Sequence, residues 1–398
     1  MLEFEAWWLL AIPLFFGLGW FAARYEAALG RSGRRRDGTG LPDAYFRGLN
    51  FLLNEQSDKA IDAFIDVVRL DPETVDLHFA LGNLFRRRGE TDRAIRVHLN
   101  LVERGGLDAL QREHALFELG QDYLKAGLLD RAEDAFVRLE GTGYGAPALH
   151  HRLEIAQMVR DWPLAIRLAE RLQRDRGENR ARDIAQFRCE LAARALAGES
   201  GSRFDHARRE LDQAQQVDAS HPRPRLLRGE VAAAEGDHAA AIEAWRGVER
   251  DSPEWLALVA PGWLAAFTAL GRRDEGIDAL EAVHREHPSI DAFTALATAR
   301  AERDGGAASV AWAEQALQAA PSLLGLERLL AMKAALRRSD EQAEVELAQR
   351  LIQAQARRLS RYVCSHCGFK ARQFYWQCPG CNRWDTYAPR RSEELERG

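Results

Sequence analysis

A helical pattern that returns about every 34 residues is the feature that most limits what this chain can fold into. From residue 41 onward, glycine, alanine and aromatic residues recur in the same order. Gly48 and Gly82 are 34 residues apart, and Gly82 and Gly120 are 38 apart. A unit of this length is one helix pair, which cannot bury its apolar face alone and must stack on its neighbours. The pattern therefore predicts an all-α array of stacked helix pairs.

Each recurring position has a physical role within the helix pair. The glycine lets the first helix approach the second closely, and the alanine twelve residues later, as in Gly48 with Ala60 or Gly82 with Ala94, is the small residue that faces it. A proline after the second helix ends that helix, because proline cannot donate the next backbone hydrogen bond. Pro72 occupies this position in the first unit.

These positions resemble the tetratricopeptide repeat, clearly in the first three units and in fragments further along. The later fragments are Trp162, Ala165, Ala207, Leu211, Gly229, Gly236, Ala241, Trp245, Pro253, Phe267, Gly271, Leu280, Pro288, Trp312 and Pro321. The resemblance implies eight or nine units over residues 41–359. It also implies a superhelix whose concave face binds peptides or partner helices. We expect the side chains that face this groove to include Phe79, Asn83, Arg86, Phe117, Gln121 and Leu124.

An uncharged apolar stretch, residues 6–23, precedes the array. As a helix it would be about 27 Å long, which is enough to cross the hydrocarbon core of a membrane. Trp7, Trp8 and Trp20 lie near its two ends, where indole rings favour the headgroup interface. Residues 1–23 are therefore predicted to form a transmembrane anchor, through which the chain contacts membrane lipid.

The charges beside this stretch predict its orientation. Glu3 and Glu5 precede it, and five arginines follow it within residues 24–40, a glycine-rich segment that we expect to be a basic, flexible linker. Since positive flanks stay inside, the body should face the cytoplasm. A cleaved signal peptide is disfavoured, because it would carry positive charge before the apolar run. A buried core helix is disfavoured as well, because the stretch is apolar on every face and is followed by the linker.

Four cysteines close to the C-terminus form the strongest site signal. Cys364 and Cys367 make one C-x-x-C turn, and Cys378 and Cys381 make a second one after a ten-residue spacer. Four thiolates form a closed tetrahedral site with no open position for a substrate. We predict that these four residues bind one structural zinc or iron ion, with zinc favoured, in a small domain at residues 360–390. His366 lies within the first turn and is expected to be a bystander.

The surrounding sequence resembles a rubredoxin-type knuckle pair. Its aromatic residues are expected to form a miniature core around the metal, comprising Tyr362, Phe369, Phe374, Tyr375, Trp376 and Trp384. So short a domain cannot bury enough apolar surface alone, and metal binding should supply much of its folding free energy. Rubredoxins carry electrons on iron, whereas other tetrathiolate sites mostly hold zinc, and the spacing does not choose between the two metals.

No other part of the sequence indicates chemistry. Motifs for nucleotide binding, zinc proteolysis and serine hydrolysis are absent. Cys189 is predicted to be a small core residue, and His150 and His151 a solvated pair. A net charge of −5 argues against general nucleic-acid binding. We therefore predict a scaffold and not an enzyme.

The order of anchor, basic linker, repeat array and knuckle resembles the lipopolysaccharide assembly protein B family of Gram-negative bacteria. The resemblance implies an inner-membrane adaptor that regulates lipopolysaccharide synthesis. Such adaptors present the deacetylase of the committed step of lipid A synthesis to a membrane-anchored AAA metalloprotease, which degrades it. Other inner-membrane lipopolysaccharide regulators or transport proteins would be further partners. Two alternatives remain: a rubredoxin-like electron-transfer protein, and an envelope-assembly scaffold in the periplasm.

Overall fold

The computed structural model describes residues 43–54, 56–70, 74–198, 201–336, 350–353, 355–356, 359 and 361–395. The predicted anchor (1–23), the predicted linker (24–40) and Pro72 lie outside these residues. Among the helices described, none combines the length and the apolar character needed to span a bilayer. The chain divides into two compact units, Met1–Gly143 and Tyr144–Gly398, and each is described by itself.

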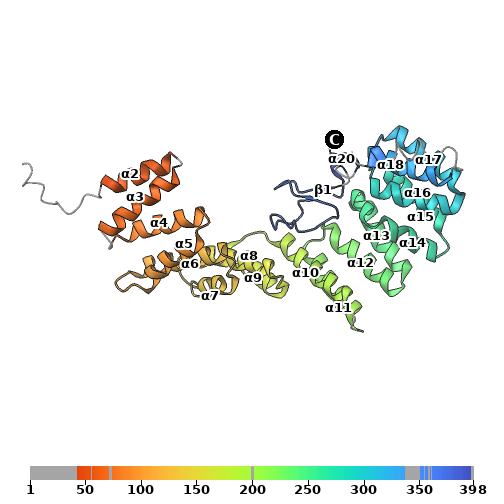
Figure 1. The fold of residues 1–398 in the computed structure, drawn as a ribbon. Helices are drawn as coiled ribbons and strands as arrows, with labels where there is room; N and C mark the ends of the chain where they lie inside the picture. The colour runs from red at the N-terminus through yellow and green to blue at the C-terminus, as the bar shows by residue number, and fades with distance from the viewer. Residues whose placement is uncertain are drawn as a thin grey trace, which may run out of the picture. The chain divides into compact units, whose positions relative to one another are not determined.

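Unit 1 is a stack of three antiparallel helix pairs (Figure 1). Its helices are α2 (Asp43–Leu53), α3 (Ser57–Leu70), α4 (Val75–Arg87), α5 (Thr91–Glu103), α6 (Ala109–Lys125) and α7 (Leu129–Val137). The helix α6 starts with a capping box, in which Asp108 accepts a hydrogen bond from the backbone N–H of Gln111 at 2.7 Å.

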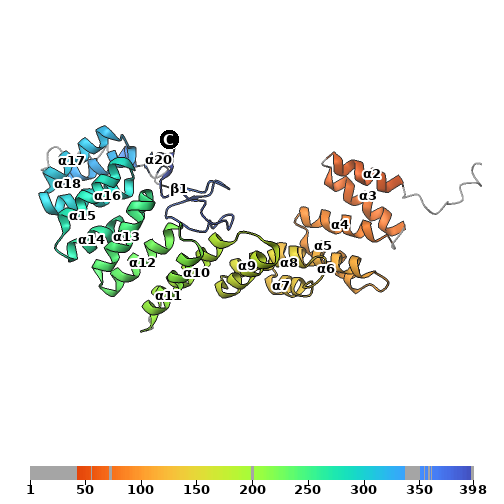
Figure 2. The same cartoon turned by 180° about the vertical axis from the view of Figure 1, so that it is seen from behind.

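Unit 2 continues the helix pairs and ends in a small non-helical domain (Figures 1 and 2). Its helices are α8 (Gly145–Met158), α9 (Trp162–Arg176), α10 (Ala181–Ala197), α11 (Arg203–Val217), α12 (Pro222–Glu235), α13 (His238–Asp251), η1 (Pro253–Val259), α14 (Ala260–Ala269), α15 (Arg273–Glu286), α16 (Ile290–Asp304), α17 (Gly306–Ala319), α18 (Leu323–Leu336) and α20 (Ser392–Leu395). Strands β1 (Tyr362–Val363) and β2 (Lys370–Ala371) belong to the small domain. The described residues thus hold eight helix pairs followed by α18, in agreement with the predicted eight or nine units.

A glycine facing a large ring holds the two helices of a pair together. Gly48 faces Phe64, Gly82 faces His98, Gly120 faces Phe136 and Gly229 faces Trp245, always sixteen residues further along the chain. A Cβ atom on any of these glycines would lie 2.1–2.8 Å from the ring. The alanines twelve residues after these glycines are fully buried (Ala60, Ala94, Ala132 and Ala241). The predicted close approach of the two helices is confirmed.

Prolines end the second helix of three pairs in unit 2, as predicted. Pro253, Pro288 and Pro321 each stand two residues after the last residue of α13, α15 and α17. A proline in the helix would remove a backbone donor and clash with the preceding turn, so the chain turns here into the next pair.

The expectation for the groove of unit 1 is only partly correct. Phe79 and Phe117 are buried and offer no surface to a partner. Phe79 stacks on His114 of the next first helix, with ring centroids 4.1 Å apart, and Phe117 packs against Phe136. Large apolar side chains at these positions are buried between neighbouring units, because this removes more apolar area from water than exposure in a groove would.

Polar residues in unit 1 join successive pairs through a buried network. Arg86 of α4 donates to Asp122 at 2.7 Å and to Glu118 at 2.5 Å, both on α6, and also to Asn83 at 2.6 Å. The other carboxylate oxygen of Asp122 lies 2.5 Å from Nδ1 of fully buried His98. Because buried charges must be paired, this network fixes the register of α4 against α6.

The contact between Gly229 and Trp245 gives a direct test of the packing rule. Replacing Gly229 by alanine would put a Cβ 2.1 Å from the Trp245 Nε1 atom, which donates to the Leu226 carbonyl at 3.1 Å. We expect a loss of about 1–3 kcal/mol, typical of overpacking, measured by urea unfolding. Gly201→Ala, where a Cβ meets nothing within 4 Å, is the control and should change stability little. Equal stability of the two variants would contradict the packing rule.

Candidate metal centre and its docking surface

The C-terminal domain, residues 361–395, is built from two similar tight turns and is called the knuckle below. The strands β1 and β2 pair antiparallel, with Tyr362 opposite Ala371, and carry the first turn. Each turn folds back on its first cysteine: the Gly368 N–H donates to the Cys364 carbonyl at 3.0 Å, and the Asn382 N–H to the Cys378 carbonyl at 2.8 Å. Gly368 and Asn382 both have positive φ, 73° and 56°, a conformation that glycine and asparagine tolerate.

The two turns bring four sulfur atoms to one point. The Sγ atoms of Cys364 and Cys381 are 3.8 Å apart, those of Cys367 and Cys378 are 3.7 Å apart, and all four lie within 4.8 Å of one another. With a metal–sulfur distance of about 2.3 Å, a tetrahedral site has sulfur–sulfur edges of about 3.8 Å. The residues present therefore fit one tetrahedral zinc or iron ion. That they bind it stays a prediction.

Hydrogen bonds to sulfur prepare this site for a cation. The backbone N–H of Cys367 points at the Cys364 sulfur and that of Gly380 at the Cys378 sulfur, both at 3.4 Å. Burial opposes ionisation of Cys364, but hydrogen bonds from Thr386 and from backbone amides lower its pKa to about 6. Burial raises the pKa of Cys381 to about 12. At neutral pH a bound metal would replace the proton on the Cys381 sulfur, whereas the Cys364 sulfur is already mostly ionised.

The predicted aromatic core around the metal is partly wrong. Tyr362 and Tyr387 are buried there, with Phe374 and Tyr375 packed beside them. Phe369 is exposed, and Trp376 and Trp384 instead pack against the helices. A domain of this size has too little interior to enclose all of these rings. The rings on its surface are buried only where the domain docks on the helices.

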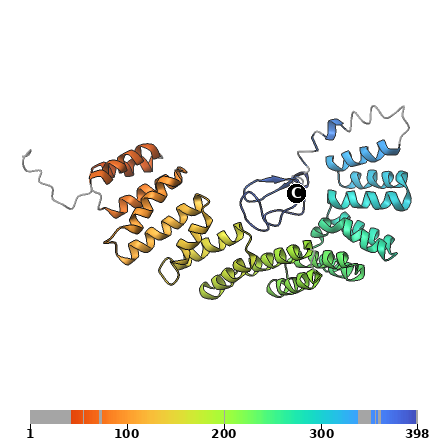
Figure 3. The ribbon, with the colours of Figure 1, turned by 60° about the horizontal axis from the view of Figure 1, so that its bottom comes forward.

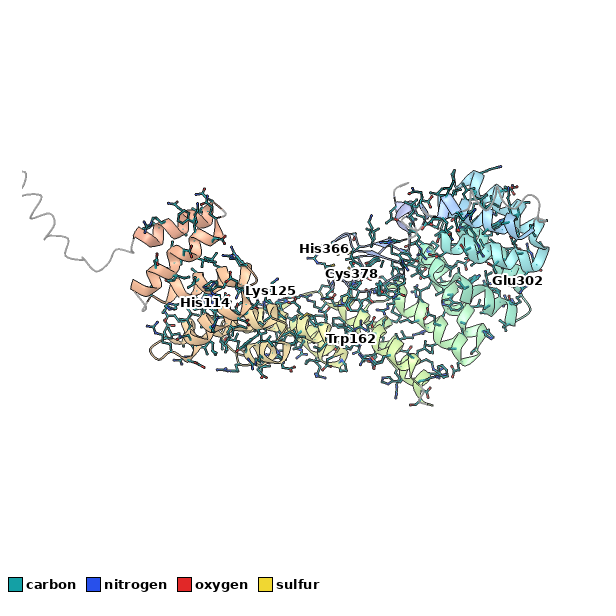
Figure 4. The ribbon with its side chains drawn as sticks, viewed as in Figure 1. His114, Lys125, Trp162, Glu302, His366 and Cys378 are labelled. Atoms are coloured by element: carbon teal, nitrogen blue, oxygen red, sulfur yellow. The ribbon has the colours of Figure 1, made fainter. Side chains whose placement is uncertain are left out.

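Trp384 inserts into the helix array. Its ring lies edge-on to Trp162 of α9 and Phe187 of α10, with both centroids 5.8 Å away. Its Nε1 atom donates to the Gln157 side chain of α8 at 2.8 Å, so the polar end of the indole is satisfied. Figure 4 labels Trp162 in the array together with Cys378 and His366 in the knuckle.

A second contact is a cation held between two indole rings. Arg223 of α12 is 4 % exposed, and its guanidinium carbon lies 5.1 Å from the Trp376 ring centroid and 5.9 Å from that of Trp384. It also donates to Glu190 at 2.6 Å and to Gln186 at 2.5 Å. Trp376 also stacks on Trp255 of η1, with ring centroids 4.9 Å apart and an interplanar angle of 10°.

Asp385 completes the polar part of this contact. It has φ 54° and accepts from Arg182 Nε and from Gln186 Nε2, both at 2.6 Å. The ring of His221 is fully buried beside it, 3.7 Å from the carboxylate. Burial lowers the pKa of His221 to about 4, so this side chain adds no charge to the interface at neutral pH.

The end of the knuckle is fastened to later helices by carboxylates. Asp291 of α16 accepts from the Tyr362 hydroxyl at 2.8 Å and from Arg391 at 2.7 Å. Glu394 accepts from the Ile290 N–H at 2.6 Å, and Glu393 accepts from the first N–H groups of α18. Carboxylates at helix N-termini satisfy orphan donors and the helix dipole. In Figure 3 the knuckle lies on the inner side of the curve traced by the helices of unit 2.

The remaining predicted residues have ordinary positions. Cys189 is fully buried among alanine and leucine side chains, and burial raises its pKa to about 12, which confirms the predicted core role. His366 is exposed and lies outside the sulfur cluster. His150 and His151 pair with Glu178 and Glu154 at the surface.

The sequence reasoning missed the docking residues. Arg223, Gln186 and Asp385 lie in parts of the chain that are far apart in sequence, and no periodic pattern links them. One feature of the sequence could have predicted the docking. A domain of this size cannot enclose both Trp376 and Trp384, so a contact between these rings and another part of the chain was to be expected.

Helix pairs of the tetratricopeptide type, carrying a docked knuckle of four cysteines, define a repeat scaffold with a site suited to one metal ion. Residues 362–389 match the family described as rubredoxin metal binding domain. Lipopolysaccharide assembly protein B of Escherichia coli K12 is 34% identical over 384 residues, which cover 96% of this chain and 97% of that protein. The chain therefore belongs to the lipopolysaccharide assembly protein B family.

A more distant relative and two solved structures also match. Lipopolysaccharide assembly protein B of Haemophilus influenzae is 27% identical, covering 96% of this chain and 99% of that one. A tetratricopeptide repeat protein from Parabacteroides merdae covers 73% of this chain and 97% of its own, at 12% identity and TM-score 0.26. The tetratricopeptide repeat protein YrrB covers 49% and 94%, at 18% identity and TM-score 0.33.

Replacing Cys364 and Cys367 together by serine tests the metal site. Serine stays protonated at neutral pH and is a poor ligand, so two of four sulfurs are lost. We expect metal content to fall from about one zinc or iron per chain towards zero and the knuckle to unfold, while the helices of unit 1 stay intact. Elemental analysis and circular dichroism measure both.

The matched control for this pair is Cys189→Ser, which changes a cysteine outside the cluster and should leave metal content unchanged. A native chain without metal, or a double variant that keeps its metal, would show that the four sulfurs are not ligands.

Proposed function

We propose that this chain is a non-enzymatic inner-membrane adaptor that regulates lipopolysaccharide synthesis. It presents the deacetylase of the committed step of lipid A synthesis to a membrane-anchored AAA metalloprotease, which degrades the deacetylase. Residues 1–23 anchor it, residues 24–40 form a basic linker, the array of residues 41–359 binds partners in the cytoplasm, and residues 360–390 hold one structural metal ion, for which zinc is favoured.

One observation carries this proposal: the match to relatives named lipopolysaccharide assembly protein B extends over 96% of the chain. The architecture supports an adaptor, because stacked helix pairs offer extended surface to proteins. Four sulfur ligands would leave no open position on a tetrahedral ion, which suits a structural role.

Depleting the protein tests the adaptor role. If the chain delivers the deacetylase to the protease, then depletion should lengthen the half-life of the deacetylase severalfold and raise lipopolysaccharide. Pulse-chase of the deacetylase measures this, and a protease substrate of another pathway serves as the control. An unchanged half-life of the deacetylase would refute the adaptor role.

Deleting residues 1–23 tests the anchor. A tether confines adaptor and membrane protease to one surface and raises their effective concentration, which release into the cytosol would dilute. We expect the shortened chain to fold and to be soluble, but to restore little deacetylase turnover at native expression level. Replacing the segment by an unrelated transmembrane helix should restore turnover, whereas full activity of the shortened chain would contradict the proposal.

A further inference from the structure

A hollow of about 920 Å³ lies between the knuckle and the helices α14 and α16 of unit 2. Its floor is mostly apolar and includes exposed Ala265 and Ala269 on α14 and half-buried Ala295 on α16. Phe374 of the knuckle forms part of its wall. A second hollow of about 200 Å³ adjoins it, because Leu258 and Phe374 line both. The two hollows share these two lining residues and are together called the knuckle groove below.

The walls of the knuckle groove offer a few polar groups on a mostly apolar surface. The hydroxyls of Thr294 and Thr298 donate to backbone carbonyls of their own helix at 2.8 and 3.0 Å. The Thr298 oxygen also accepts from Arg328 at 3.4 Å, and the Thr294 oxygen can accept a hydrogen bond. Gln373 of the knuckle also lines the larger hollow, and its amide nitrogen donates to the Tyr375 hydroxyl at 2.5 Å. An apolar floor with a small number of placed polar groups is the usual composition of a binding site.

Most charges along the knuckle groove are already neutralised. Arg391 pairs with Asp291 at 2.7 Å, and Arg273 pairs with Glu302 at 2.9 Å. The guanidinium of Arg372, in the larger hollow, has no ion pair or hydrogen bond to any residue that the structure describes. The larger hollow therefore carries one unpaired positive charge, that of Arg372.

The smaller hollow carries the opposite charge. Glu230 of α12 lines it and makes no ion pair within the described part of the chain. Arg223 lies nearby, but its guanidinium is committed to Glu190 and Gln186. Glu230 is an exposed residue, yet the protein around its carboxyl group raises its pKa by desolvation, which Arg223 only partly offsets. A cation placed beside Glu230 would stabilise its carboxylate.

We propose that the knuckle groove binds a short peptide segment of a partner protein. The segment carries a basic side chain for Glu230, apolar side chains for the alanine floor around Ala265, and an acidic group for Arg372. This inference rests on the proposed adaptor function and deepens it, because it locates where a protein partner engages the scaffold. The free carboxylate of Glu230 disfavours nucleic acid, whose phosphates it would repel.

The probe is a displayed library of random twelve-residue peptides, selected on the full-length chain in lipid nanodiscs. Counter-selection uses Ala265→Trp, which fills the floor at an exposed position. We expect enriched peptides to carry basic, apolar and acidic residues together. Their Kd, measured by fluorescence anisotropy, should rise about tenfold or more in Ala265→Trp, and likewise in Glu230→Lys and Arg372→Glu.

Charge exchange makes the test specific. A peptide whose basic residue is replaced by glutamate should bind the native chain weakly and Glu230→Lys tightly. Matched controls are Ala239→Trp and Glu243→Lys on α13, and Arg209→Glu on α11, all exposed residues outside the groove. These three variants should leave Kd unchanged, and metal content and circular dichroism show that all variants are folded.

Three results would overturn the inference. The first is that the selection yields no peptides above the Ala265→Trp background. The second is that the groove variants do not weaken binding of the selected peptides. In the third, the native chain self-associates and Ala265→Trp abolishes this, which would assign the groove to a second copy. Binding is measured on purified protein, so it can fail while depletion still lengthens the deacetylase half-life, and the reverse outcome is equally distinguishable.

Discussion

A domain of fewer than about 40 residues cannot bury enough apolar surface to fold unaided, and the C-terminal half of this structure is arranged around that constraint. The knuckle has two supports. Inside, four sulfurs converge at the spacing of a tetrahedral metal site. Outside, Trp376 and Trp384 are buried against helices of the array. Neither support replaces the other. The sulfur cluster fixes the two turns, and docking buries the tryptophan rings that the turns leave exposed.

The same contact constrains the array. Stacked helix pairs touch only their neighbours, so their curvature is ordinarily set by small local rotations. In unit 2 the knuckle contacts α8 through Trp384, α10 through Asp385 and α12 through Trp376, and also reaches η1, α16 and α18. One small domain thus contacts helix pairs that are not all successive in the stack, from α8–α9 to α16–α17. A scaffold held in this way presents its surface in one shape, which lowers the entropy that a partner must pay on binding.

The periodic features of this molecule could be predicted from sequence, because each depends on residues at fixed spacing. A glycine meets a ring sixteen residues later in several units, as Gly120 meets Phe136. Cys364 and Cys378 each start a turn whose form is determined by local residues. The docking could not be predicted. Gln186 and Asp385 are far apart in the chain, and their contact depends on where tertiary packing places the knuckle. The buried position of Phe79 was missed for a related reason, since spacing identifies a helix face but not which neighbour covers it.

Hydrogen–deuterium exchange of the full-length chain, with its metal and after removal of the metal by a chelator, tests this account most directly. The account predicts that metal removal exposes the amides of residues 361–395 and also lowers protection in α10 and α12, where Gln186 and Arg223 lose their partners. Protection in α2 to α7 of unit 1 should not change. A knuckle that keeps its protection without metal, or a loss confined to the knuckle while α10 and α12 stay fully protected, would contradict it.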